Sequence, residues 1–192
     1  APRPARPPAA PPRRRPPFSA MATRVTAWAS WAEWRHVYES LASNDPTRRA
    51  FGVQRVQTWR SRGKLPVAVD VTASFVEAML NDPACSPATK APRSEHELQL
   101  LYGMCFVRLV NGIVDVARSG AGRSMSTVAQ ELEWPQWFVD LRHEATHQRL
   151  PSLHALQLAS QEALYLLFER FWRPQQEQLE RRGRARVPRL GR

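Results

Sequence analysis

The sequence predicts an all-α protein, a bundle of five to seven helices. Apolar residues recur at spacings of three and four along most of the chain, which is the period of a helix that buries one side. Helix-starting signatures stand directly before several of these stretches. No segment alternates polar and apolar residues as a half-buried strand would, and no internal repeat is present. The 192 residues suffice for one domain with a buried core and are too few for two large ones.

Three helices are predicted before residue 82. Ser30 and Glu33 form a capping box, and the helix that follows carries an apolar stripe of Trp34, Val37, Tyr38 and Leu41. The Asp-Pro pair at 45–46 begins a second helix, which Gly63 ends. A third helix is predicted at about 70–80, before the next Asp-Pro pair.

The second half of the chain is predicted to hold four helices. A second capping box at 94–97 begins the longest one, which runs to about Arg118 and is apolar on most sides, as expected of a central helix. Shorter helices are predicted at 126–133 and 135–147. A long helix begins at Pro151, a residue suited to a first helical turn, and runs to about Trp172.

The net charge of +11 is concentrated at the two ends of the chain. Residues 1–20 hold five arginines and residues 181–192 hold six, and neither segment has an acidic residue. The remaining 17 of the 28 basic residues balance the 17 acidic residues of 21–180. We therefore expect a disordered Pro/Arg-rich tail at 1–20, a neutral helical domain at 21–180 and an Arg-rich tail at 181–192. Net charge alone does not identify the domain as a nucleic-acid binder.

Several classes of protein are disfavoured by composition. Two cysteines, Cys85 and Cys105, can form neither a disulfide framework nor a cysteine-based zinc site. The most apolar stretch, Leu98 to Val116, is interrupted by polar and charged residues, which indicates a buried helix and no membrane span. The first 20 residues lack the apolar run of a secretory signal, so export is not expected. The basic segment 59–64 is interpreted as a solvated helix end in preference to a phosphate contact.

One predicted helix carries a dense polar cluster, the octapeptide DLRHEATH at 140–147. At 100° per residue its buried side holds Phe138, Leu141 and Ala145, and its opposite side holds Asp140, His143 and His147. Arg142 lies about 140° around the helix from His147 by the same arithmetic. A solvated face that happens to carry two histidines is the simplest interpretation, and two chemical hypotheses compete with it.

The first hypothesis is a zinc hydrolase, because residues 143–147 spell HExxH. His143 and His147 would bind the metal and Glu144 would act as general base, with Glu169 as a distant third ligand. The longer zinc-protease pattern is missing here, and Pro151 ends the helix soon after the second histidine.

The second hypothesis is metal-free cleavage of RNA. An RNA strand carries its own nucleophile, the 2′-hydroxyl, so the protein must supply a proton shuttle and a cation for the charged transition state. Histidine suits proton transfer near neutral pH, and arginine suits planar contact with phosphate. His147, near a helix C-terminus, is also placed where a protonated ring is favoured.

Arg142, followed by His143 and, four residues later, by His147, resembles the RxxxxH signature of the HEPN superfamily of helical ribonucleases. Four blocks resemble, in order, the amino-terminal domain of the Las-type endoribonucleases, and the resemblance extends over about residues 28–172. The blocks are WAEWRHVYESL at 31–41, WRSRGKLPVAV at 59–69, ELQLLYGMCFVRLVNG at 97–112 and VDLRHEATHQRLPSL at 139–153.

The resemblance implies an HEPN-like fold with Arg142, His143 and His147 as catalytic residues, with no metal and no other cofactor. It implies cleavage of the second internal transcribed spacer of precursor ribosomal RNA, which leaves 2′,3′-cyclic phosphate and 5′-hydroxyl ends. It further implies a homodimer with a composite site, a polynucleotide 5′-kinase partner and a place in the nucleolus of the nucleus. Family members usually continue beyond this domain, and a C-terminal segment helps to engage the kinase. A non-catalytic HEPN scaffold in pre-ribosome assembly is the alternative, with the zinc hydrolase third.

Overall fold

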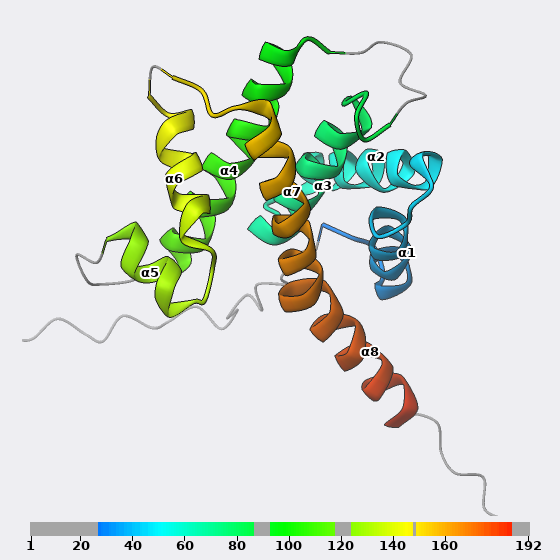
Figure 1. Ribbon diagram of the computed structural model, residues 1–192. Coiled ribbons are helices and arrows are strands. Elements are labelled where there is room, and N and C mark those ends of the chain that lie inside the picture. Colours follow the sequence, from blue (N-terminus) through cyan, green and yellow to red (C-terminus); the bar gives the residue numbers. More distant parts are fainter. Residues whose placement is uncertain (1–26, 87–92, 118–123, 148, 186–192) are drawn as a thin grey trace, which may run out of the picture.

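The computed structural model describes residues 27–86, 93–117, 124–147 and 149–185, and every regular element within these ranges is a helix (Figure 1). The predicted all-α class is therefore confirmed. Because α7, η1 and α8 follow one another without a break, the described residues form seven continuous helical segments, within the predicted five to seven. The elements are α1 (Trp31–Leu41), α2 (Pro46–Arg62), α3 (Val67–Leu80), α4 (Glu95–Ala117), α5 (Met125–Glu131), α6 (Gln136–Ala145), α7 (Leu153–Leu167), the π-helical turn η1 (Phe168–Trp172) and α8 (Arg173–Ala185).

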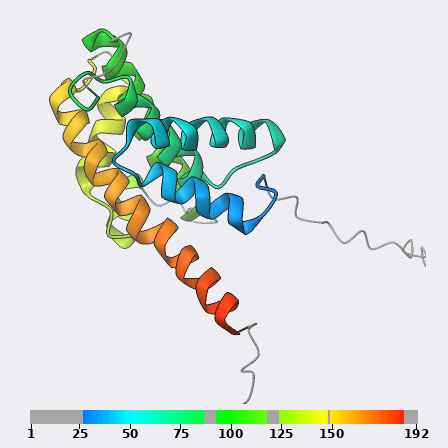
Figure 2. The ribbon, with the colours of Figure 1, turned by 90° about the vertical axis from the view of Figure 1, so that its right-hand side faces the viewer.

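Helix α4 is the centre of the bundle, as its apolar sequence predicts. It packs against α3, α5, α6 and α7, while α1 packs mainly on α2 and α2 on α3. The continuous rod of α7, η1 and α8 crosses the body, and α8 extends beyond the other helices in both ribbon views (Figures 1 and 2). Among the described helices, none combines the length and the apolar composition that a bilayer crossing requires.

Aromatic side chains fill the core between α1, α3 and η1. Trp34 and Trp172 are fully buried, with ring centroids 5.0 Å apart. The indole Nε1–H of Trp172 donates to the hydroxyl of Thr72 at 3.0 Å, which satisfies this buried donor. Trp137 of α6 is half-buried, and its indole N–H donates to Glu162 at the surface.

Several predicted helix limits are wrong. The last helix begins at Leu153, with Ser152 as its N-cap, rather than at Pro151, and the helix predicted at 126–133 spans Met125–Glu131. Helix α3 begins at Val67 rather than near 70, because Pro66 has a φ of −57° that suits the residue before a helix. Helix α6 ends at Ala145 rather than His147, with Thr146 as its C-cap. The last helix continues for 13 residues after Trp172 as α8, because the π turn changes the hydrogen-bond register just before Pro174, which has no N–H to donate.

The predicted tails are only partly within the described ranges. The segment 1–20 lies outside them altogether. Of the segment 181–192, residues 181–185 belong to α8 and the others lie outside the described residues. Both predicted N-caps are present, since Ser30 and Ser94 accept from the backbone N–H groups of Glu33 and Glu97. The reciprocal bond of a capping box joins the Ser94 N–H to Glu97, whereas Glu33 accepts from the N–H of Ala29.

Candidate functional site

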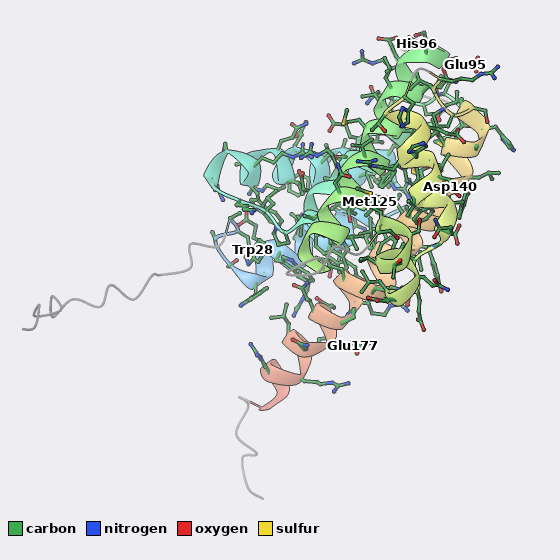
Figure 3. All side chains as sticks on the ribbon, turned by 90° about the vertical axis from the view of Figure 1, so that its left-hand side faces the viewer. Trp28, Glu95, His96, Met125, Asp140 and Glu177 are labelled. Carbon is green, nitrogen blue, oxygen red and sulfur yellow. The ribbon has the colours of Figure 1, made fainter. Side chains whose placement is uncertain are left out.

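Helix α6 carries the polar cluster and lies along α4 (Figure 3, where Asp140 marks α6 and His96 the start of α4). Phe138 and Leu141 are buried and hold α6 against the bundle, as the sequence predicts. A Cβ added to Gly103 of α4 would lie only 3.2 Å from the Cβ of Ala145. The missing side chain at Gly103 thus allows the C-terminal end of α6, with the motif, to approach α4 closely.

Arg142 is anchored to the central helix. Its Nε–H donates to the side-chain carbonyl Oδ1 of Asn111 on α4 at 3.1 Å, and the side chain is half-buried. A guanidinium has five N–H donors in a rigid planar fork, and this bond engages only the one at Nε. Asn111 therefore fixes the plane of the fork, and within the described part of the chain no hydrogen bond occupies the terminal Nη groups, which can donate to an anion.

The two histidines of the motif lie together at the surface. The ring centroids of His143 and His147 are 4.2 Å apart, with 57° between the ring planes, and both residues are exposed. Because α6 ends at Ala145, His147 is not part of the helix. Its backbone N–H donates to the carbonyl of Glu144 at 3.0 Å, in a turn that brings it back beside His143.

The structure brings part of the predicted cluster together. The histidines pair with each other, while the hydrogen bond recorded for the Arg142 guanidinium leads to α4 and not to a histidine. The straight-helix angle of about 140° between Arg142 and His147 does not apply, because the helix ends between them. Asp140 and Glu144 are exposed on the same helix.

The zinc hypothesis lacks a ligand set within the described residues. No group of three or more His, Cys, Asp or Glu side chains that could hold a metal ion occurs there. Glu169, the third ligand of that hypothesis, lies in η1, where its carboxylate pairs with Arg173 at 2.6 Å. The HExxH pattern also needs both histidines on one helix, and His147 lies outside α6.

Asn111 is the residue of this site that the sequence does not single out. It is one of the polar residues that interrupt the apolar stretch 98–116. A half-buried amide within an apolar helix requires a hydrogen-bond partner, so the interruption itself was the available signal. The partner, Arg142, lies 31 positions further along the chain, and the helical pattern around Asn111 does not indicate it.

Comparison with known proteins places this site in a defined context. Residues 26–174 match the model of the family described as Las1-like. The chain is 35% identical over 155 residues to ribosomal biogenesis protein LAS1L of Mus musculus, an alignment of 80% of this chain and 19% of that protein. It is 35% identical over 159 residues to protein LAS1 of Saccharomyces cerevisiae, with 78% and 31% covered. It is 31% identical over 124 residues to pre-rRNA-processing protein las1 of Schizosaccharomyces pombe, with 64% and 24% covered. The chain thus spans between a fifth and a third of the length of these relatives.

Proposed function

The chain belongs to the Las1-like family, and from this premise we propose that it is a metal-independent HEPN-type endoribonuclease that acts on precursor ribosomal RNA. The observation that carries the proposal is the arrangement at the end of α6, where two exposed histidines lie together and the arginine of the same motif is anchored to α4. The names of the relatives from mouse and fission yeast refer to ribosome biogenesis and to pre-rRNA processing, which supports this substrate class.

The proposed reaction needs only groups that the RNA and the motif supply. The 2′-hydroxyl of one nucleotide loses its proton and attacks the adjacent phosphorus, and the bond from phosphorus to the 5′-oxygen breaks. The departing 5′-oxygen takes up a proton, so the ends are a 2′,3′-cyclic phosphate and a 5′-hydroxyl. His147 is the principal acid and base, Arg142 stabilises the charge of the transition state, and His143 assists or positions the phosphate. The proposed target within the precursor is the second internal transcribed spacer.

Cleavage of spacer RNA by the purified chain, with and without EDTA, tests this function. Cleavage that persists in EDTA and yields cyclic phosphate ends is expected, whereas loss in EDTA with recovery by zinc would favour the hydrolase. Arg142→Ala and His147→Ala should each lower the rate by at least about 100-fold, as expected on loss of a charge stabiliser or proton shuttle. Glu144→Gln is the matched control, because Glu144 is exposed on the same helix and has no role in this reaction. No cleavage even with a polynucleotide 5′-kinase present would favour a non-catalytic scaffold.

We further propose that the active unit is a homodimer in which two motifs face one another. Apolar side chains that a second copy could cover lie exposed on α4 near Gly103 and on α7: Leu100, Leu101, Met104, Leu158 and Tyr165. In such a dimer Arg142 of one copy would complete the histidine pair of the other. Mixing the inactive variants Arg142→Ala and His147→Ala should then restore part of the activity, because mixed dimers keep one intact site. Full activity of a monomer would contradict the arrangement.

Association with a polynucleotide 5′-kinase and a nucleolar location in the nucleus complete the proposed function. Cleavage of this type leaves a 5′-hydroxyl, which is the substrate of such a kinase, so the two activities are chemically consecutive. Co-purification of the kinase with the tagged chain tests the association. Fluorescence microscopy of the tagged chain in cells tests the location. Absence of both would restrict the proposal to the isolated cleavage reaction.

A further inference from the structure

An open hollow of about 620 Å³ lies where the end of α2 and the start of α3 meet α4. This volume is within the range of about 300–1,000 Å³ that is usual for small-ligand sites. Its charged lining consists of Arg60 from the end of α2, Lys64 from the loop after α2, Asp70 from α3 and Arg108 from α4. These side chains come from three helices and one loop, and nothing in the mechanism proposed above uses them.

Two of the three positive side chains of the hollow, Arg60 and Arg108, are held in place by one carboxylate. Asp70 accepts from the Nε of Arg60 at 2.5 Å through one oxygen, and it pairs with Arg108 through the other. Arg60 also donates to the hydroxyl of Ser74 at 2.9 Å, which fixes its guanidinium further. Two arginines oriented in this way lose little conformational freedom when they bind an anion.

The hollow keeps a positive excess in spite of Asp70. Its lining has three cationic side chains and one carboxylate. Lys64 is exposed and forms no ion pair with the described residues, and the Arg108 side chain is 52% exposed, with only one of its terminal nitrogens on Asp70. Free N–H donors from both side chains are thus available to an anion, and phosphate matches the geometry of a guanidinium.

Asn111 connects this hollow to the motif on α6. Its side chain is part of the lining, and its Oδ1 atom accepts the hydrogen bond from Arg142. Arg108 precedes Asn111 by three positions on α4, so both lie on the same side of that helix. A phosphate bound at Arg142 and a phosphate bound in the hollow would therefore lie on either side of one asparagine.

We propose that the hollow binds a backbone phosphate of the RNA strand, next to the phosphate that is cleaved. This inference rests on the proposed function, since it takes single-stranded RNA as the ligand. Lys64 and Arg108 contact the phosphate, and Arg60 and Asp70 position Arg108. The segment 59–64, which the sequence favours as a solvated helix end, becomes part of the substrate site because folding places Arg108 and Asp70 beside it.

The test is binding of a short single-stranded 2′-O-methyl RNA, which lacks the attacking hydroxyl and cannot be cleaved. The variants are Lys64→Gln and Arg108→Gln, singly and together. Arg48→Gln is the matched control, because Arg48 is exposed on α2 without an ion pair among the described residues and lies about 18 Å along the helix from Arg60. Thermal unfolding of each variant checks that the fold is retained.

Each single variant should weaken binding several-fold and should reduce the slope of log K against log salt by about 0.7, the value for one lost contact to a single strand. The double variant should reduce the slope by about 1.4. The control should keep the affinity and slope of the parent. Parent-like binding by both Lys64→Gln and the double variant would overturn the proposal.

Inorganic phosphate provides a second arm, in which its binding is measured at constant ionic strength. If Lys64→Gln abolishes phosphate binding but leaves RNA binding unchanged, the hollow is a small-anion site and the RNA assignment is overturned. Failure of the proposed function is a different result: the parent would bind RNA through the hollow and leave a cleavable RNA intact.

Discussion

Replacing Asn111 by leucine removes the acceptor of the Arg142 Nε–H and keeps a side chain of similar size on α4. We expect this change to lower the rate of RNA cleavage with little effect on stability. The bond is 3.1 Å long, it involves a charged donor, and both side chains are half-buried. A hydrogen bond to a charged group contributes about 1.5–3 kcal/mol. Water can replace part of this at a half-buried site, which leaves about 1–2 kcal/mol for the orientation of the guanidinium.

That free energy corresponds to a fall of about five- to thirtyfold in kcat, since about 1.4 kcal/mol is a factor of ten. The fall should be smaller than that of Arg142→Ala, because Asn111→Leu leaves the charge in place. Asn111→Asp offers a contrast: it keeps an acceptor but adds a negative charge that offsets the guanidinium. We therefore expect it to preserve the position of Arg142 and still to cleave slowly.

Two measurements separate positioning from other roles of Asn111. Steady-state kinetics should show the loss of Asn111→Leu mainly in kcat, whereas loss of a contact in the hollow alone would raise KM. Nuclear magnetic resonance should show faster solvent exchange of the Arg142 Nε–H in Asn111→Leu than in the parent or in Asn111→Asp. Unchanged kcat together with unchanged exchange would refute the reasoning. A lower melting temperature with unchanged kcat per folded molecule would assign Asn111 to stability alone.

Three further predictions concern packing and charge. Gly112→Ala would place a Cβ 2.4 Å from Cγ1 of Val67, so it should lower the free energy of unfolding in urea by about 1–3 kcal/mol. Adding Val67→Ala should recover most of this loss. A single variant as stable as the parent would contradict the close approach. Trp172→Phe removes the buried donor to Thr72 and should lower the free energy of unfolding by about 1–3 kcal/mol in the same assay. An unchanged urea midpoint would show that this hydrogen bond contributes nothing to stability. Burial raises the pKa of Glu33, but hydrogen bonds from an indole and a backbone N–H and two nearby arginines outweigh it, and the net pKa is lowered. The stabilisation by the Glu33 carboxylate is present above its unfolded pKa of about 4.5 and is lost as the pH falls below that value. The melting temperatures of the parent and Glu33→Gln should therefore converge in acid. A difference in melting temperature that widens in acid would contradict this prediction.

The helices were predictable because their signals are local. A capping box joins residues three positions apart, and an apolar stripe repeats within one turn, so both can be read from a short window of sequence. The N-caps at Ser30 and Ser94 and the central position of α4 followed from such windows. The ends of α3, α6 and the last helix did not. They depend on a proline conformation, a C-terminal turn and a π turn, for which the helical period carries no signal.

The sequence indicates which residues form the candidate site, but it indicates their arrangement only in part. The motif at 142–147 stood out because it is a dense polar cluster on an otherwise regular helix. Its geometry was misjudged, because a straight helix was assumed through His147, and the turn after Ala145 changes the direction of that side chain. The partner of Arg142 and the assembly of the hollow depend on helices that meet only in the folded chain. Asp70 and Arg108 are 38 positions apart, and no pattern within either helix joins them.

Helix α4 shows what a polar interruption in an apolar helix can indicate. Arg108 and Asn111 argue against a membrane span, yet that argument leaves open why a central helix carries them. In the folded chain Arg108 pairs with Asp70, and Asn111 accepts from Arg142, so each interruption marks a contact with another helix. Asn111 is half-buried, where a polar group is costly unless it is paired, while Arg108, one turn before it, reaches the open hollow. In this chain these contacts lie between the basic hollow and the motif at 142–147, along the path that we propose for a strand of RNA.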